Sequence, residues 1–254
     1  MSETIKEIKK QLKKVRSIHS PFFYKWLHDP RKGVQAALYT KARRLIKRQK
    51  KIEQFSSRCH YERYLHRQGY QYVAGIDEVG RGPLAGPVVT CAIILPENFD
   101  LIDVNDSKQL SPHRRETLYP KILDQAIDFS VGIGSNHLID RINIYNADRV
   151  AMKRAVLSLN RSPDYLIVDA MTIPVHFPQL KLYHGDTKSV SVGAASIVAK
   201  VYRDHLMNKY GLEYPQYDFK HNAGYGTKEH LQALRKYGIT PIHRLSFAPV
   251  RRYK

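Results

Sequence analysis

Two adjacent acids, Asp77 and Glu78, stand at the end of a short apolar run and are soon followed by Gly80, Arg81 and Gly82. Adjacent carboxylates repel each other, so each resists ionisation beside its neighbour. A divalent cation with oxygen ligands is the commonest compensator of such a pair. The glycines allow the backbone to approach a ligand closely where a Cβ would block it. The stretch therefore predicts a metal-binding acid pair beside a backbone cradle.

Two further acids follow strand-like runs later in the chain. Asp169 closes the apolar run 165–168, where a carboxylate is unusual because Asp disfavours strands and burial of charge is costly. We therefore favour a functional role for Asp169 over a cap. Asp186 follows the short run 180–183, and on residue type alone it could equally be a cap of the next helix.

If the strands that precede them are neighbours, these four acids converge on one patch. Carboxylates without His or Cys are hard oxygen ligands, which suit Mg²⁺ or Mn²⁺. In a basic protein such a patch indicates phosphoryl-transfer chemistry on nucleic acid, in which two metal ions can activate a water and stabilise the leaving oxygen. The residues alone thus predict a metal-dependent nuclease or phosphoryl-transfer enzyme.

A tyrosine between two glycines, Tyr225, is a candidate for substrate contact. Loop tyrosines of this kind are exposed more often than not and can stack on a sugar or a base. The alternative is a turn residue that covers the edge of the core. Asp204 lies in a helical stretch near Lys200 and Arg203, where a structural ion pair is favoured over metal binding.

The 254-residue chain has a formal net charge of +19, which is unevenly distributed. Residues 1–60 hold 17 Lys and Arg against 4 Asp and Glu, whereas the rest of the chain holds 25 against 19. A basic segment on a more balanced core suggests a polyanionic partner, most often nucleic acid. A dense basic stripe on the helix expected over 34–55 could contact phosphates or could simply face solvent; it comprises Lys41, Arg43, Arg44, Lys47, Arg48, Lys50 and Lys51.

Nothing in the sequence predicts a membrane segment. The longest apolar run, 88–95, has eight residues, far fewer than the roughly 18 that a membrane span needs. The lysine-rich start has no apolar signal-peptide core, and Cys59 and Cys91 lack metal-binding spacing. We expect a cytoplasmic monomer whose partner is nucleic acid rather than a membrane.

Hydrophobic periodicity places strands and helices in alternation over most of the chain. Helices are expected over 5–15, 34–55 and 61–69, and strands over 72–77, 86–95, 129–133, 165–169 and 180–183. A short Gly-Pro turn separates the first two strands, which predicts an antiparallel pair. Asn143 is a candidate helix cap, and four aromatic residues are expected to form a small core near the N-terminus: Phe22, Phe23, Tyr24 and Trp26. This order indicates an α/β or α+β layer fold, with a mixed sheet covered by helices.

The stretch 76–89, IDEVGRGPLAGPVV, resembles the signature of the type 2 ribonucleases H, specifically bacterial ribonuclease HII. Further stretches match the same family in order: 105–110, 168–169, 185–186, 194–204, 224–227, 243–244 and 246–247. The resemblance implies an α/β, RNase H-like mixed five-stranded sheet flanked by helices. It implies a catalytic domain over 67–254, including the C-terminal helices, and leaves 1–66 as a basic helical N-terminal extension.

The resemblance also implies an activity and a set of site residues. The activity is cleavage of RNA in RNA–DNA hybrids and incision beside single ribonucleotides in duplex DNA, leaving a 3′-hydroxyl and a 5′-phosphate. Four catalytic acids are implied to hold divalent metal, Mg²⁺ or Mn²⁺: Asp77, Glu78, Asp169 and Asp186. The backbone of the 80–82 loop matches the motif that reads the ribose 2′-hydroxyl, a group that both donates and accepts hydrogen bonds. Tyr225 matches a tyrosine that stacks on the neighbouring deoxyribose, and Ser107 and Lys108 match a phosphate-contacting loop.

Three alternatives stay open at this point. Ribonuclease HIII, a sister family, generally lacks the arginine between the glycines, so Arg81 favours the HII type. A different RNase H-like nuclease would cut DNA without ribose, and a non-catalytic nucleic-acid-binding module would use the acids only structurally. For the extension, we hypothesise that phosphate contacts raise its affinity for the duplex.

Overall fold

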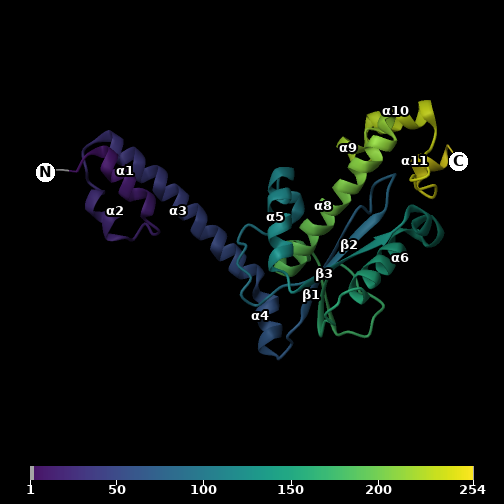
Figure 1. Ribbon diagram of the computed structural model, residues 1–254, viewed down its shortest axis with the longest axis horizontal. Helices are drawn as coiled ribbons and strands as arrows, with labels where there is room; N and C mark the ends of the chain where they lie inside the picture. The colour runs from purple at the N-terminus through teal and green to yellow at the C-terminus, as the bar shows by residue number, and fades with distance from the viewer. Residues whose placement is uncertain (1–2, 254) are drawn as a thin grey trace. The chain divides into compact units, whose positions relative to one another are not determined.

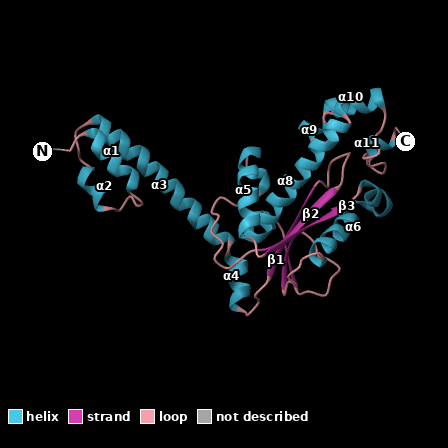
Figure 2. Cartoon of the chain, viewed as in Figure 1, coloured by secondary structure: helices cyan, strands magenta, loops and turns pink. Residues whose placement is uncertain are grey.

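The sheet has five strands, the number that the family resemblance implies, in the order β3-β2-β1-β4-β5. Strand β2 (Val88–Ile94) runs antiparallel to both of its neighbours, β1 (Val73–Val79) and β3 (Asp128–Gly134). Strands β4 (Tyr165–Asp169) and β5 (Gln179–Leu182) continue the sheet from β1 in parallel. Figure 2 shows the magenta strands among the helices of this part of the chain. The predicted antiparallel pairing of the first two strands is confirmed, and so is the mixed sheet.

This computed structural model describes residues 3–253. The chain forms two compact units, residues 1–57 and residues 58–254. The sheet and all later helices belong to the second unit. In the described part of the chain, none of the helices is both long and apolar enough to cross a membrane.

Helices α6 (Asn136–Leu157) and α8 (Val190–Glu213) cover the sheet on opposite faces (Figure 1). Alternate β1 residues face them: Ala74 and Ile76 pack with α6 side chains, whereas Gly75 lies against α8. A Cβ on Gly75 would lie 2.5 Å from the Ser191 hydroxyl oxygen, so only glycine lets α8 approach this closely. Because side chains alternate along a strand, Asp77 is on the α8 face and Glu78 on the α6 face.

The remaining elements of the second unit surround this layered core. They are α4 (His60–Arg67), η1 (Ser107–Gln109), α5 (Pro112–Gln125), α7 (Gly185–Lys188), η2 (Pro215–Tyr217), α9 (Phe219–Asn222), α10 (Lys228–Tyr237) and α11 (Ala248–Arg251). Helix α4, expected over 61–69, ends two residues before Gly69, whose φ of +94° is the left-handed conformation of a glycine cap.

Asn143 divides α6 into two segments and caps the second, which confirms its predicted role. Its backbone leaves the helical conformation at φ 66° and ψ 166°. Its side-chain Oδ1 accepts a hydrogen bond from the backbone N–H of Asn146, at 3.0 Å. The second segment therefore starts with a satisfied first turn, and this segment carries the residues that pack on β1 and β2.

The first unit is a small helical body made of α1 (Ile5–Lys14), α2 (Pro21–Trp26) and most of α3 (Lys32–Arg58). Its core is mainly aliphatic and consists of Ile8, Leu12, Phe23, Val34 and Leu38. The expected aromatic core is correct for Phe23, against which Phe22 and Trp26 pack partly buried, and wrong for Tyr24, which is 61% exposed. Successive residues on a helix point in directions about 100° apart, so neighbouring aromatic residues cannot all face inward.

Candidate active site

Three of the four predicted acids converge where β1 and β4 end. The parallel register pairs Ile76 with Val168, so the next residues, Asp77 and Asp169, lie side by side. Asp77, Glu78 and Asp169 each offer a carboxylate oxygen to a cluster in which these atoms lie within 4.8 Å of one another. Oxygen ligands sit about 2.0–2.6 Å from a hard divalent ion, so oxygens that share one ion lie within about 5 Å of each other. The cluster therefore has the dimensions of a shared cation site.

The backbone holds the acids in this cluster in place. The backbone N–H of Gly185 donates to Asp169 Oδ1 at 2.6 Å, and the N–H of Glu78 donates to Asp77 Oδ1 at 2.8 Å. After Asp169 the chain turns at Ala170, whose φ of 50° lies in the left-handed region. Asp169 thus stands at a sharp change of direction, although its sequence context gives no turn signal.

Burial and mutual repulsion work against the charge on these acids. Burial raises the pKa of Asp77 well above its usual range, and the carboxylates of Glu78 and Asp169 raise it further. Burial also raises the pKa of Glu78 to about 8, with added repulsion from Asp148 and Asp169. A divalent cation would lower the pKa of both Asp77 and Glu78, because it favours the ionised form of each acid. The all-carboxylate donor set therefore fits a hard cation such as Mg²⁺ or Mn²⁺.

Asp186 lies on α7, next to but outside the three-acid cluster. The alternative that it caps the following helix is wrong, because Ser189 is the N-cap of α8 and its hydroxyl accepts from the N–H of Val192. Burial raises the pKa of Asp186, and the carboxylates of Asp106 and Asp169 add to the shift. The ammonium of Lys108 lies 3.9 Å from Asp186 Oδ2. Asp186 thus lies outside the three-acid cluster and has a cation, Lys108, within ion-pair distance.

Two buried arginines fix the loop that joins β1 to β2. Arg244 donates from Nη2 to the carbonyl of Gly80 at 2.6 Å and from Nη1 to the carbonyl of Arg81 at 2.8 Å. Its Nε donates to the carbonyl of Gly86 at 2.9 Å. Burial lowers the pKa of Arg244 to about 9. One guanidinium therefore ties both ends of the loop together.

Arg203 on α8 repeats this arrangement on the same loop. Its Nε donates to the carbonyl of Pro87 at 3.0 Å and its Nη2 to that of Ala85 at 3.2 Å. Gly80 adopts a φ of +100°, and a Cβ there would lie 2.2 Å from Arg203 Nε. Glycine is therefore required at position 80 by both its backbone conformation and its contact with Arg203.

A cavity of about 340 Å³ opens beside the acids. Its walls combine the end of β1, the glycine loop and parts of three later segments: Asp77, Glu78, Val79, Gly80, Arg81, Gly82, Ser107, Lys108, Ser196, Lys200 and Tyr225. Every predicted substrate-contacting residue lines this one cavity. Asp169 and Asp186 do not line it.

The residues opposite the glycine loop differ in how freely they can reach a ligand. Tyr225 is 47% exposed, and its ring edge is 3.4 Å from the position that a Cβ on Gly82 would take. Lys108 carries its side chain into solvent, whereas Ser107 is buried and its hydroxyl accepts from Ser196 Oγ at 2.8 Å. Tyr225 and Lys108 are thus available for contact, while Ser107 also has a structural partner.

Three residues at the site were not identified from the sequence. Arg203 and Arg244 act on the loop, and Asp148 on α6 adds a fully buried carboxylate beside the three-acid cluster, whose pKa burial raises to about 7. One signal for Asp148 was available: it stands four residues before Met152 on a helix face that is otherwise apolar. Arg203 and Arg244 lie in stretches that match the family, 194–204 and 243–244, but no local pattern indicates their role because the loop carbonyls that they contact are more than 100 residues away in the chain.

Comparison with known proteins identifies the family. Residues 74–250 match the family described as Ribonuclease HII, and residues 4–66 match the Ribonuclease HII N-terminal domain. The ribonuclease HII of Lactobacillus gasseri is 62% identical over 226 residues, which is 89% of this chain and 90% of that protein. The ribonuclease HII of Limosilactobacillus reuteri is 53% identical over 99% of this chain and 98% of that protein.

Solved structures agree with this fold. The ribonuclease H2 from Pyrococcus horikoshii superposes with a TM-score of 0.63 and 29% identity, over 71% of this chain and 96% of that one. Bst-RNase HIII, solved in complex with Mn²⁺, has the same fold at a TM-score of 0.58 and 19% identity, over 74% and 70% of the two chains. With a family match that spans the sheet, the acids and the glycine loop, the chain belongs to the ribonuclease HII family.

Proposed function

We propose that the protein incises duplex DNA on the 5′ side of single embedded ribonucleotides, in addition to hydrolysing the RNA strand of RNA–DNA hybrids. Membership of the ribonuclease HII family makes it an endoribonuclease that acts on RNA–DNA hybrids. One observation carries the finer proposal: the acid pair and the glycine-arginine-glycine loop open on the same cavity. A ribonucleotide read by the loop would therefore have its phosphodiester next to the acids.

The acids have distinct proposed tasks. Asp77, Glu78 and Asp169 hold the divalent metal, because among the described residues they are the one group of three or more potential ligands whose ligand atoms all lie within 4.8 Å of one another. When bound, Mg²⁺ or Mn²⁺ supplies Lewis-acid activation of the attacking water and stabilises the leaving oxygen, which yields a 3′-hydroxyl and a 5′-phosphate. Asp186 acts from the edge of the site, where Lys108 partly balances its charge.

The loop at 80–82 is proposed to recognise ribose through its backbone. Arg244 already takes up the carbonyls of Gly80 and Arg81, so the loop is held rigid before substrate arrives. A 2′-hydroxyl can both donate and accept, and backbone groups reach it only where no side chain intervenes. Tyr225 stands beside Gly82 and offers a ring face to the adjoining deoxyribose. Ser107 and Lys108 are proposed to contact a flanking phosphate.

The test uses a DNA duplex with one ribonucleotide, incubated with the full chain and Mg²⁺ or Mn²⁺. We expect metal-dependent incision 5′ to the ribonucleotide, lost in Asp77→Asn and retained in Asp124→Asn, which changes an exposed acid on α5. An all-DNA duplex should stay intact. Cleavage of long RNA tracts alone would point to HIII-type specificity, and binding without cleavage in any metal would leave a non-catalytic module.

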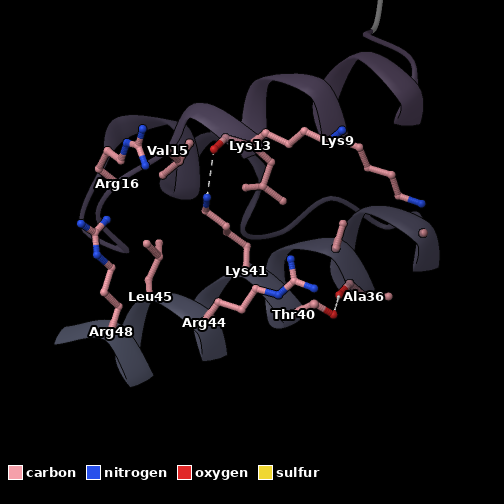
Figure 3. Close-up of a pocket in the computed structure, with 13 residues that line it drawn as sticks. Lys9, Lys13, Val15, Arg16, Ala36, Thr40, Lys41, Arg44, Leu45 and Arg48 are labelled. Carbon is pink, nitrogen blue, oxygen red and sulfur yellow. Dashed lines mark hydrogen bonds between the residues drawn. The ribbon is translucent and has the colours of Figure 1, made fainter. Parts of the chain in front are cut away.

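A second proposal concerns the N-terminal unit, which we infer binds the phosphates of the duplex. A groove of about 650 Å³ lies within this unit, and Figure 3 shows the cationic side chains around it. Its basic residues are Lys9, Lys13, Arg16, Lys41, Arg44 and Arg48. Among the ion pairs of residues 3–253, none involves any of these six. Burial lowers the pKa of Lys41, and the nearby charges of Arg16 and Arg44 lower it further, so the cations of the groove repel one another.

Salt dependence of binding tests this proposal in the full chain. Each lost phosphate contact reduces the slope of log K against log salt by about 0.9. Replacing Lys41, Arg44 and Arg48 by Gln should therefore lower the slope by roughly 2 to 3 and leave the cleavage position unchanged. The matched control replaces Lys6, Lys10 and Lys14, which lie on α1 outside the groove, and an equal decrease in that control would contradict a groove-specific role. The cytoplasmic location and the monomeric state stay predictions.

A further inference from the structure

Asp148 is a fully buried acid with no satisfying partner. Its exposed fraction is 0%, and neither carboxylate oxygen has a hydrogen-bond donor. The nearest cation is Arg81, whose Nε lies 3.5 Å from Asp148 Oδ2, outside the usual range of a charge-assisted hydrogen bond. A buried carboxylate without hydrogen bonds is costly to the fold. Such a residue needs an explanation beyond packing.

Asp148 lies on a face of α6 that is otherwise apolar and packed against the sheet. Helix residues four, seven and eight positions later are Met152, Ala155 and Val156, which are buried against Ala74 and Ile76 of β1. Asp148 therefore occupies a position on the core-facing side of α6, where the helical pattern calls for an apolar side chain. Departures of this kind from the local pattern concentrate at functional sites.

Arg81 connects Asp148 to the proposed substrate cavity. Its main chain is fixed because Arg244 donates to its carbonyl, but its side chain is 40% exposed and held only by two acids. Asp148 faces its Nε, and Glu78 Oε1 lies 4.0 Å from its Nη1. A cation bound by Glu78 competes with Arg81 for that carboxylate. Asp148 then remains as the anion that orients the guanidinium.

We propose that Asp148 is a positioning residue that holds the Arg81 side chain against the cavity wall, so that Arg81 can contact the nucleotide read by the glycine loop. This rests on the proposed function of that loop. Asp148 does not belong to the three-acid cluster whose oxygens lie within 4.8 Å of one another, which separates it from the metal ligands. Its contribution is to substrate binding through Arg81 and not to the chemical step.

The experiment measures kcat and KM on a duplex with one ribonucleotide for the wild type, Asp148→Asn, Arg81→Lys and the double variant. Asn matches Asp in shape but lacks its charge, and Lys keeps the charge of Arg81 but lacks Nε. We expect each single variant to raise KM about tenfold with kcat within about twofold of wild type. The double variant should be no worse than either single variant, because both changes break the same contact. Asp148→Glu should recover part of the loss.

Three outcomes would overturn the proposal. Additive losses in the double variant would show that Asp148 acts independently of Arg81. A decrease in metal affinity, read from the metal-induced shift of the unfolding temperature of Asp148→Asn, would make Asp148 part of the metal site. An unchanged KM in Arg81→Lys would remove the contact from substrate binding, and this variant stays informative if Asp148→Asn does not fold. If the wild type itself fails to incise at single ribonucleotides, the proposed function has failed rather than this inference.

Discussion

The protein contains two clusters of like charge, which differ in the sign of the charge and in their burial. In the catalytic unit, carboxylates of Asp77, Glu78 and Asp169 crowd together with little exposure, and burial raises the pKa of Glu78 to about 8. In the N-terminal unit, six cations surround a groove and mostly reach solvent. Repulsion between buried charges is far stronger than between solvated, salt-screened ones. The acid cluster therefore suits a small multivalent ion at fixed distances, whereas the groove suits any extended polyanion.

The largest expected effect comes from neutralising the acid cluster. Asp77→Asn should reduce cleavage on the order of 10³-fold, because a metal ligand is lost. The unfolding temperature of the metal-free protein should nevertheless rise, because burial and the neighbouring carboxylates raise the pKa of Asp77 and make this acid costly to the folded state, whether it is charged or must take up a proton. Single-turnover cleavage measures the loss of activity, and calorimetry with and without Mn²⁺ measures the change in unfolding temperature. A lower unfolding temperature without metal would mean that Asp77 stabilises the fold and that the repulsion is unimportant.

The next largest effect is expected at Gly80 and can be compared with the same substitution at Gly82. Gly80→Ala should reduce activity roughly 10²-fold, because misplacing a reactive group by about 1 Å has effects of that size. The added Cβ would meet Arg203 Nε at 2.2 Å, at a φ of +100°. Gly82→Ala is the matched comparison for the Arg203 contact, since it changes the same substrate-reading loop but its Cβ would lie 3.4 Å from Tyr225 at an unstrained backbone conformation.

For this pair, cleavage and thermal unfolding are measured on both variants. Gly80→Ala should also unfold at a lower temperature than Gly82→Ala. Equal behaviour of the two variants would show that the Arg203 contact does not set the loop conformation.

A smaller effect is expected from pH on the metal-free and metal-bound protein. The folded state keeps the Glu78 proton up to about pH 8, whereas an unfolded chain releases it near its ordinary pKa of 4.5. The folded state thus binds more protons in this window, so stability falls as pH rises through it. Metal must displace that proton, so its affinity should fall up to about tenfold per pH unit below 8.

The measurement is the metal-induced shift in unfolding temperature between pH 6 and pH 8. We expect a larger shift at pH 8 than at pH 6. Glu78→Gln should flatten the pH dependence of the metal-free protein, and an unchanged slope in that variant would assign the proton to another group.

The sequence predicted the sheet and most of the acid cluster for a physical reason. Strand runs are short and apolar, and acids that close them must lie at the sheet edge where the strands end. The positions of Asp77 and Asp169 in the chain therefore predict that the two side chains lie together once β1 and β4 are neighbours, and the structure shows that pairing. The left-handed turn after Asp169 was not predicted, because Ala170 has no residue type that favours it.

Other features depend on tertiary contacts that no local pattern carries. Arg203 and Arg244 look like ordinary helix and loop arginines in the sequence, yet in the structure they donate hydrogen bonds to backbone carbonyls of the loop that joins β1 to β2. Asp148 was hidden because a single acid in a helix normally faces solvent. The predicted aromatic core near the N-terminus failed at Tyr24 for a related reason: helical geometry turns Tyr24 outward while Phe23 faces the core.

The smallest expected effect comes from single arginines of α3 and distinguishes the side of that helix that lines the N-terminal groove from its outer side. Arg44→Gln removes one cation from the groove, while Lys41 keeps its hydrogen bond to the carbonyl of Lys13. The salt slope of duplex binding should fall by about 0.9, and stability should change by no more than a few tenths of a kcal/mol because the charge is solvated. Arg43→Gln is the control, since Arg43 is the adjacent residue on α3, stacks over Tyr39 and does not line the groove. An equal decrease in both variants would place the phosphates along the outer face of α3 instead, and the groove would then be a by-product of helix packing rather than the polyanion site.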